Sequence, residues 1–549
     1  MDVVRGKMKK LISITEVELD ETSGKRSPIT RNWEDEIIYF ILLDRFHDGG
    51  ERTSIHSRQG FGDEYSLRSY CGGNLKGVLL KLDYIKSLGC TAIWLSPFLE
   101  NINTYHGYAI RNFLNVDSHF GSQEDLIVLV EECHKRGLRV IMDVVVNHSG
   151  DVWSYKETST PYNKGKVYGF GSWKAREWPV PIELRNPNLY SKKGSIIHFD
   201  TYPETLEGDL FELKSFKNDD SAEAEKVSDI LTTVYAYWIK ATGIDGFRID
   251  AAKHLGTLAL KRFIKGIKTY TGKIGQEEFF VFAEVAAGDE QAQEFLNEIP
   301  QLDGILDFPL HFIVPELLRG EVSLEVLQKL LKHRKELPEG QTRITFLDNH
   351  DQLGQQVKRR FAEGLSEQAF ELGIGLLFCF PGIPCLYYGT EQGLTGKGKR
   401  DDVVRESMFA PNQPTDLFDP DNFYYKKIQE YSSIRRKFKA LSRGRLEVLE
   451  VKEEVNKADK ANKKSILAFS RICESELMVI ICNFSPNKKT GGYVSLEKEQ
   501  YAGVYEKITA NPSNRELFEV KTGEKDLGIN VDVLPFEILI LKKIDGKKY

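Results

Sequence analysis

The chain of 549 residues is longer than one typical hydrophobic core accommodates, so we expect two or three domains. Its 75 lysines and arginines against 81 aspartates and glutamates give a mildly acidic balance, which argues against a nucleic-acid partner. No apolar stretch is long enough to span a membrane, and the N-terminal "MDVVRGKMKKLISITEVELDE" lacks the apolar core of a signal peptide. The seven cysteines are scattered without paired motif spacing, so we interpret them as reduced thiols in a cytoplasmic protein. Nothing in the sequence indicates an oligomeric state.

Short apolar runs rich in β-branched and aromatic residues recur along the chain, most of them followed by an amphipathic, helix-like segment. One such segment, 122–137, begins with a serine and stops at a glycine, as helices commonly do. Strands alternating with helices predict a parallel sheet, and eight strands are the number that closes a (β/α)8 TIM barrel. An open doubly wound sheet is the alternative, which the lack of a glycine-rich dinucleotide fingerprint disfavours. The predicted strands lie in 36–46, 90–98, 138–148, 243–250, 279–285, 302–308, 343–351 and 383–391.

Two parts of the chain fall outside this alternation. A stretch after the third strand is rich in Tyr, Trp, Gly, Pro and Lys, and it is too long for a loop, so we expect an inserted subdomain. Near the C-terminus strand-like runs follow one another with turn signals and no helices, which predicts an antiparallel β-sandwich; the polar stretch 457–464 is expected to be an exposed hairpin loop. The expected domains are an N-terminal extension (1–30), the barrel (31–148 and 221–439), the inserted subdomain B (149–220) and the C-terminal sandwich (440–549).

Charged residues stand where several predicted strands end. In "GFRIDAAKH" (246–254), Arg248 and Asp250 are two residues apart, so in a strand they project to one side while their apolar neighbours pack outward. A buried charge is costly unless it is paired or used. A lone aspartate at a strand end is more often a cap or a turn residue than a catalyst. Here, however, many such residues are expected at the C-terminal mouth of one barrel: Asp143, Asn147, His148, Arg248, Asp250, Glu284, Asp348, His350 and Asp351.

Four of these segments resemble, in the right order, the signature segments of the α-amylase family of glycoside hydrolases. They are "DVVVNH" (143–148), "GFRIDAAKH" (246–254), "FAEV" (282–285) and "FLDNHD" (346–351). The glycine-rich "YCGGNLKG" is similar to a segment of cyclodextrin glucanotransferases and their amylase relatives. The resemblance covers roughly Asp35 to the C-terminal sandwich, and it leaves out the first thirty residues and most of the insertion.

The resemblance implies a role for each of three carboxylates. Cleavage of an acetal needs an acid for the leaving oxygen and a group that manages the oxocarbenium-like carbon. By resemblance, Asp250 is the nucleophile, Glu284 the general acid/base, and Asp351 holds the sugar hydroxyls and helps to distort the ring. We expect Arg248 to keep Asp250 ionised, because a nearby opposite charge favours the charged form. The apolar neighbours of Glu284 favour its protonated form, as an acid requires.

The resemblance also implies contacts to the sugar. His106, His148 and His350 would bond its hydroxyls, and Tyr108 would stack against its apolar face. Lys253 and His254 match family positions on the leaving-group side, although a solvated helix start explains them equally well.

Calcium is a further implication of the resemblance. Many family members bind it between barrel and insertion, through the residues that are here Asn147 and the carbonyl of His254 and through an acidic ligand of the insertion. In "GDLFELKSFKND" (208–219) that ligand is Glu212 or Ser215, and with Ser215 the site loses a charge on which calcium affinity depends. A second site would use Asp48 and Asn74.

Three functions follow as hypotheses. The first is a retaining hydrolase of α-1,4-glucosidic bonds in starch-like glucans or maltooligosaccharides. The second is a 4-α-glucanotransferase, which uses the same catalytic residues but delivers the intermediate to another sugar. The third is a non-catalytic binding protein, which the three carboxylates disfavour.

Overall fold

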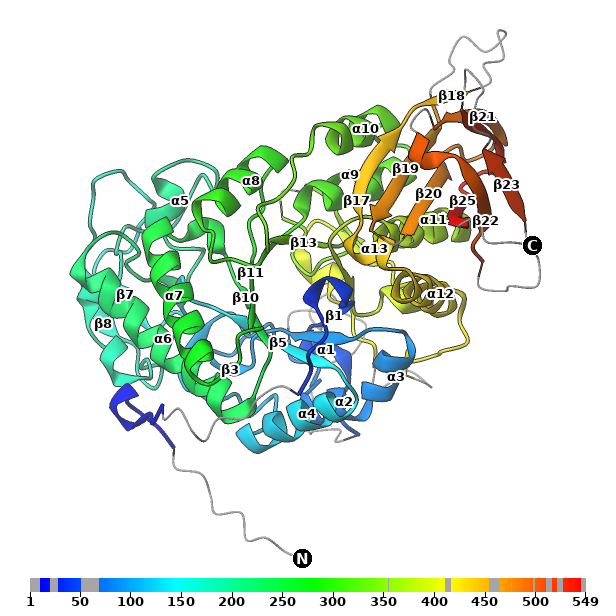
Figure 1. Ribbon diagram of the computed structural model, residues 1–549. Coiled ribbons are helices and arrows are strands. Elements are labelled where there is room, and N and C mark those ends of the chain that lie inside the picture. Colours follow the sequence, from blue (N-terminus) through cyan, green and yellow to red (C-terminus); the bar gives the residue numbers. More distant parts are fainter. Residues whose placement is uncertain are drawn as a thin grey trace, which may run out of the picture.

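Eight parallel strands close into a barrel, in the spatial order β1-β15-β13-β12-β11-β10-β5-β2 (Figure 1). The computed structural model describes residues 10–19, 28–50, 69–353, 355–409, 416–453, 464–474, 476–496, 499–509, 516–520 and 527–544. Each predicted strand contributes one barrel strand, so the TIM barrel is confirmed and the open-sheet alternative is wrong. The barrel strands are β1 (Ile38–Ile41), β2 (Ala92–Leu95), β5 (Arg139–Val144), β10 (Gly246–Ile249), β11 (Phe280–Ala283), β12 (Gly304–Leu306), β13 (Thr342–Thr345) and β15 (Ile383–Tyr387).

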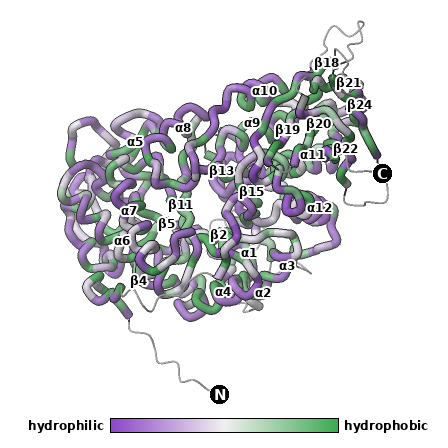
Figure 2. The backbone as a smooth tube through the Cα atoms, viewed as in Figure 1, coloured by the Kyte–Doolittle hydropathy of each residue, from purple (hydrophilic) through white to green (hydrophobic). Residues whose placement is uncertain are grey.

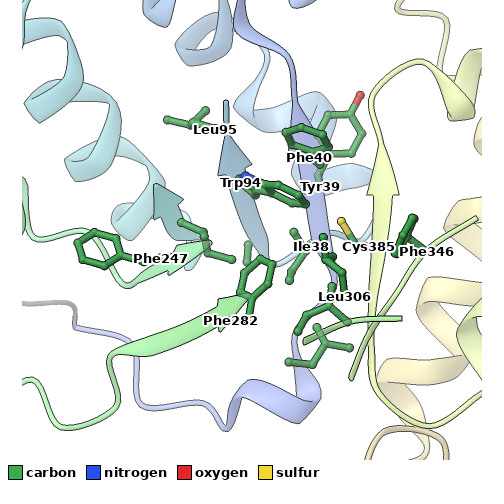
Figure 3. Close-up of a cluster of buried hydrophobic side chains, with 14 of the residues drawn as sticks. Ile38, Tyr39, Phe40, Trp94, Leu95, Phe247, Phe282, Leu306, Phe346 and Cys385 are labelled. Carbon is green, nitrogen blue, oxygen red and sulfur yellow. The ribbon is translucent and has the colours of Figure 1, made fainter. Parts of the chain in front are cut away.

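Large side chains fill the barrel interior. The rings of Phe40 and Trp94 are stacked at 3.8 Å, and Trp94 meets Phe282 edge to face at 5.6 Å. Figure 3 shows these three side chains between the strands, with Phe247 directed away from them. Phe247 instead packs against Tyr235 of an outer helix, at 5.7 Å between ring centroids. The alternation expected for β10 is therefore present: apolar residues face the helices, and Arg248 faces the interior.

The outer helices alternate hydrophilic with hydrophobic residues along their length (Figure 2). The predicted helix at 122–137 is α4, which Ser122 and Asp125 open with reciprocal side-chain-to-backbone bonds, a capping box. The long helix α6 ends at Gly243, whose φ of 76° lies in the left-handed region that favours glycine. The helices of the barrel are α1 (Leu43–Phe46), α2 (Leu75–Leu80), α3 (Leu82–Ser87), α4 (Gln123–Lys135), α6 (Ala222–Thr242), α7 (Thr257–Lys273), α8 (Asp289–Glu298), α9 (Phe308–Leu318), α10 (Leu324–His333), α11 (Glu367–Cys379), α12 (Phe423–Lys437) and α13 (Lys439–Arg443).

The insertion after β5 forms a small body of its own with an aromatic core. Trp153 is fully buried and packs against the rings of Tyr155 and Tyr190. Strand β6 (His148–Ser149), which leaves the barrel, pairs with β9 (Lys214–Ser215), which leads back to it. The insertion also contains the strands β7 (Trp153–Tyr155) and β8 (Phe170–Trp173), the helix α5 (Glu204–Glu207) and two short 3₁₀ helices at Ile182–Leu184 and Pro187–Leu189.

Residues 10–19 of the N-terminal extension lie against the insertion and against α6. The hydroxyl of Ser13 and the N–H of Ile14 both donate to the Glu183 carboxylate. The N–H of Ile182 donates to the carbonyl of Ile12 at 2.9 Å, and Lys240 of α6 donates to the Glu18 carbonyl. The segment thus connects the insertion with an outer helix of the barrel.

The C-terminal strands form two antiparallel sheets with a hydrophobic core between them, which confirms the sandwich. Figure 1 shows this domain and the insertion on opposite sides of the barrel. Phe469 of the sandwich stacks on Phe380 of the barrel at 5.4 Å. The expected hairpin loop at 457–464 falls, except for Lys464, outside the described residues. The strands are β17 (Arg445–Leu449), β18 (Val451–Glu453), β19 (Ile466–Cys473), β20 (Glu476–Asn483), β21 (Thr490–Ser495), β22 (Gly503–Lys507), β23 (Leu517–Val520), β24 (Gly528–Val533) and β25 (Ile538–Ile544).

Within the described residues, no helix combines the length and the apolar character that crossing a bilayer requires.

Candidate active site

The guanidinium of Arg248 lies at the centre of a cluster of carboxylates at the C-terminal mouth of the barrel. Its Nη1 is 2.7 Å from Oδ1 of Asp143 and 2.7 Å from Oδ1 of Asp250, and its Nη2 is 2.8 Å from Oε2 of Glu284. The register of the strands brings these side chains together, because Arg248 on β10 lies beside Asp143 on β5 and beside Phe282 on β11. Arg248 and Asp250 therefore point to one side, as their spacing predicts.

Burial dominates the ionisation of this cluster. It raises the pKa of Asp250 to about 7 although Arg248 opposes the shift, and neighbouring carboxylates raise it further. Burial likewise raises the pKa of Asp143 to about 6. Arg248 opposes the rise at Asp250, as expected, but it serves three buried carboxylates and does not outweigh burial. Near neutral pH the cluster consequently retains protons that isolated carboxylates would lose.

Glu284 is the carboxyl best placed to carry such a proton. Burial raises its pKa above the ordinary value, and the charges of Asp250 and Asp351 add to this rise against the pull of Arg248. The N–H of Ala251, a residue in the left-handed region at a φ of 48°, donates to Oε2 at 2.9 Å. The other oxygen, Oε1, is buried and has no hydrogen-bond partner among the described protein atoms. A proton on Oε1 thus leaves every observed contact of Glu284 intact.

Asp351 has the opposite electrostatic setting. Burial by itself raises the pKa of this carboxyl, but His350 and Arg405 outweigh it and hold the pKa well below its usual range. Nε2 of His350 is 3.0 Å from Oδ2 of Asp351, and Arg405 pairs with Oδ1. Arg405 is held in turn by the carbonyl of His350 and the hydroxyl of Tyr105. Asp351 is therefore an ionised carboxylate throughout the neutral and mildly acidic range.

Tyr108 connects the carboxylates around Arg248 with the group formed by His350 and Asp351. Its hydroxyl lies 2.9 Å from Oδ2 of Asp143 and 2.9 Å from Nε2 of His350. The indole N–H of Trp94 donates to the same oxygen of Asp143 at 3.1 Å. Gly107, which precedes Tyr108, has a φ of 83°, and a Cβ there would stand 1.9 Å from the Pro97 carbonyl oxygen. Only glycine therefore fits between His106 and Tyr108.

Two of the three predicted sugar-binding histidines are neutral. The N–H of Tyr108 donates to Nδ1 of His106, and burial lowers the pKa of that imidazole to about 3. Burial also lowers the pKa of His148 to about 4, and its Nε2 is 3.3 Å from the Tyr108 carbonyl. His350 is fully buried and bonds Asn349 through Nδ1. All three lie around Tyr108, so the structure brings the predicted set together.

Lys253 and His254 lie at the edge of the site, in the short 3₁₀ turn after β10. Lys253 pairs with Asp200 of the insertion and donates to the carbonyl of Ala286, two residues beyond Glu284. Nδ1 of His254 lies 2.9 Å from the carbonyl of Thr205, also in the insertion. The insertion therefore reaches the catalytic loops on this side.

A cavity of about 490 Å³ opens beside the cluster. Its lining includes Arg405, which pairs with Asp351, together with Tyr105, His106 and Asp401. Sequence motifs do not point to Arg405, because the segment after β15 matches no signature segment. Its role follows from its contact to Asp351 alone.

The residues of the second predicted calcium set take part in local hydrogen bonds. Oδ1 of Asn74 accepts from the N–H of Gly77 as the cap of α2, and its Nδ2 donates to the Asp48 carbonyl. Oδ1 of Asp48 accepts from the N–H of Gly50. No group of three or more His, Cys, Asp or Glu that could hold a metal occurs among the residues described. Calcium binding stays a prediction, and no step of the reaction is assigned to a metal.

Comparison with known proteins agrees with this geometry. A family model described as "Alpha amylase, catalytic domain" matches residues 40–441. The chain belongs to the α-amylase family of glycoside hydrolases. Within the family, an α-amylase of Streptomyces lividans is 29% identical over 475 residues, which cover 73% of this chain and 49% of that protein. A cyclomaltodextrin glucanotransferase of Klebsiella oxytoca is 25% identical over 492 residues, covering 82% of this chain and 70% of that protein.

Among solved structures of the family, the α-amylase from Geobacillus thermoleovorans complexed with acarbose superposes with a TM-score of 0.72 at 26% identity. The superposition covers 94% of this chain and 100% of that one. The chain spans about half the length of the Streptomyces relative.

Replacement of Glu284 by glutamine tests the proton donor. Glu284→Gln keeps the shape of the side chain and removes the titrating proton, so we expect kcat on maltoheptaose to fall by about 10²–10⁴-fold. Glucan binding, measured by calorimetry, should stay nearly unchanged. Any residual activity should lack the alkaline limb of the wild-type pH profile, where a carboxyl of raised pKa loses its proton. Glu277→Gln, an exposed glutamate before β11, is the control, and a near-normal rate for Glu284→Gln would contradict the assignment.

Replacement of Arg405 tests the electrostatics of Asp351. Arg405→Met removes the cation that lowers the pKa of Asp351. That pKa should rise towards its ordinary value, which a pH titration of the aspartate carboxyl carbons followed by NMR measures directly. Arg405→Lys, which keeps the charge, should shift the pKa less. Arg400→Met is the matched control, since Arg400 pairs with Asp402 instead. An Asp351 pKa that stays in place in Arg405→Met would show that Arg405 does not act through Asp351.

Proposed function

We propose that the chain is a retaining glycoside hydrolase that cleaves α-1,4-glucosidic bonds of starch-like glucans or maltooligosaccharides. The observation that carries this proposal is the binding of Asp250 and Glu284 to the two Nη atoms of one guanidinium. Two carboxylates held so near each other favour direct attack by one of them over activation of an intervening water, which requires a wider gap. Membership of the α-amylase family supports the choice of an α-glucan as the substrate.

In the first step, a carboxylate oxygen of Asp250 attacks the anomeric carbon while the glycosidic bond breaks. The proton on Oε1 of Glu284 moves to the leaving oxygen, so the departing sugar is released as a neutral alcohol. In the second step, Glu284 takes a proton from water, and the hydroxyl replaces Asp250 at the anomeric carbon. Asp250 and Glu284 thereby return to their starting protonation states.

The surroundings favour a protonated Glu284, and Arg248 opposes the rise in pKa that burial gives Asp250. Arg248 contacts both carboxylates, and as the nucleophile is consumed its positive charge remains to balance Asp143. Asp351, kept ionised by His350 and Arg405, can accept bonds from the hydroxyls of the sugar and face the positive charge that develops at the ring. The neutral imidazole of His106 accepts from Tyr108 through Nδ1 and keeps its Nε2–H for a sugar hydroxyl. The single N–H of neutral His148 is directed at the Tyr108 carbonyl, so this ring can offer Nδ1 as an acceptor.

Transfer to a second sugar is the other candidate function, and an exposed aromatic pair favours it. Phe211 of the insertion is 72% exposed and Phe199 is 38% exposed, with their rings 5.5 Å apart. Phe199 also meets the ring of His254 edge to face at 6.3 Å, so the pair lies beside the turn that follows Asp250. Aromatic faces suit the apolar faces of sugars. Such a platform would hold an acceptor glucan on the leaving-group side, where it competes with water. The similarity to a cyclomaltodextrin glucanotransferase supports this alternative.

Chromatography of the products from maltoheptaose distinguishes the two functions. We expect shorter oligosaccharides alone, with reducing ends rising in step, because water then accepts the glucosyl group. Products longer than the substrate with few new reducing ends would make the enzyme a glucanotransferase. A lack of any product, with Glu284→Gln equally inactive and the protein folded, would reject both.

Removal of the exposed ring tests the platform independently. Phe211→Ser should lower the ratio of transfer products to hydrolysis products at high maltoheptaose concentration, while hydrolysis of a short chromogenic maltoside changes little. Tyr202→Ser, at 78% exposure in the same insertion, is the control for loss of an exposed ring. An unchanged ratio in Phe211→Ser would exclude the ring from acceptor binding.

A further inference from the structure

The junction between insertion and barrel is where the predicted calcium ligands would lie. Strand β9 returns to the barrel beside β6, with Ser215 opposite His148 and with the N–H of Phe216 donating to the Asn147 carbonyl at 2.9 Å. This register places Ser215 next to Asn147. Of the two residues that the sequence offers as the ligand of the insertion, Ser215 is therefore the one at the junction. Glu212 is exposed.

Ser215 brings no charge to this position, and its polar atoms are already used. Its hydroxyl donates to the Gly208 carbonyl at 2.9 Å, and its N–H donates to Oδ1 of Asp209 at 2.9 Å. The other oxygen of the Asp209 carboxylate accepts from the Tyr155 hydroxyl. The buried carboxylate of Asp209, which lies beside Ser215, is thus tied into the insertion. Calcium affinity depends on the number of carboxylate ligands, and Asn147, Ser215 and the His254 carbonyl supply none.

A side-chain amide joins the two carbonyls that face each other across the junction. Nδ2 of Asn218 donates to the carbonyl of His254, in the barrel loop after β10, at 2.9 Å. The same Nδ2 donates to the carbonyl of Leu206, in helix α5 of the insertion, at 3.0 Å. The His254 carbonyl is the predicted backbone ligand of calcium, and here it accepts a hydrogen bond instead.

We infer that the amide of Asn218 takes the place of a metal ion in this chain, so that the insertion is held to the barrel without calcium. An amide NH₂ has two donors, and two carbonyls satisfy both of them. A dication bound between the same carbonyls would require the Asn218 side chain to move away or its amide group to flip, which exchanges Oδ1 and Nδ2. In the flipped orientation, Oδ1 of Asn218 would face two carbonyl oxygens, an arrangement that only a cation stabilises. The two orientations therefore have opposite consequences for metal dependence.

Among the predicted calcium ligands, Asn147 is the residue whose surroundings favour a bound ion or water. Its side chain is 1% exposed, and neither Oδ1 nor Nδ2 has a hydrogen-bond partner among the described protein atoms. One neutral amide supplies no charge to offset the dehydration of a dication, whereas a buried water satisfies such a group. The inference consequently requires that Asn147 holds no calcium, and the experiment is designed around that requirement.

The melting temperature of the full chain gives the first measurement. Protein treated with chelator and then dialysed is melted with excess calcium chloride and with chelator, and its calcium content is measured by mass spectrometry. A ligand bound only by the native state raises the melting temperature, so equal melting temperatures and no stoichiometric calcium support the inference. If calcium raises the melting temperature and Asn147→Ala abolishes this effect, the inference is overturned. A calcium effect that survives in Asn147→Ala belongs to another part of the chain and leaves the junction metal-free.

Conversion of the amide to a carboxylate gives the second measurement. Asn218→Asp replaces two donors by an anion that faces two carbonyls, so the variant should melt below wild type in chelator and regain stability on addition of calcium. Asn218→Ala loses both bonds without creating a ligand, and its melting temperature should fall equally with and without calcium. Asn188→Asp, an exposed asparagine of the same insertion, is the control. A calcium response of Asn218→Asp no larger than that of Asn188→Asp would place Asn218 away from any cation position and overturn the inference.

Discussion

The buried guanidinium of Arg248 is the constraint on which the catalytic centre depends. Fully removed from water, it would be strongly unfavourable without anions, and each of Asp143, Asp250 and Glu284 would be unfavourable without a cation. The charges are compatible only because three neighbouring barrel strands deliver them to one point at fixed height. A shift of β10 by one residue would turn Arg248 towards the outer helices. The register of the barrel strands therefore determines which charges meet, and with them the ionisation of these carboxyl groups.

This arrangement gives each carboxyl a different proton affinity from a shared set of charges. Burial raises the pKa of Asp250 and Glu284, and one cation shared among three carboxylates does not reverse this rise. Asp351 draws on His350 and Arg405 instead and has a lowered pKa. A protonated Glu284 and an ionised Asp351 can therefore lie together at the C-terminal end of the barrel.

The sequence predicts the barrel and the catalytic cluster well because both depend on local patterns. Strands buried on both faces are continuous apolar runs, and Arg248 and Asp250 interrupt one of them at a spacing that fixes their direction. Arg405 and Asn218 could not be predicted in the same way, since each acts through contacts to residues distant in the chain and lies in no periodic pattern. The apolar runs near the C-terminus correspond to β17–β21 and β25, and they do not indicate strands β22 to β24 of the sandwich. In β24, however, Ile529, Val531 and Val533 are buried and alternate with exposed Asn530 and Asp532, so a period-two signal was present in the sequence.

The N-terminal segment that lies across the insertion has a consequence for the order of folding. Ser13 contacts a residue 170 positions later in the chain, and Glu18 contacts one 222 positions later. During synthesis these residues leave the ribosome well before Glu183 and Lys240 exist, so they remain without their binding surface until the insertion and α6 have formed. Contacts between residues so far apart in sequence form slowly, because closing the long loop between them costs entropy before the contacts can offset that cost. The docking of residues 10–19 is thus a late event that reports the completion of the insertion and its barrel helix.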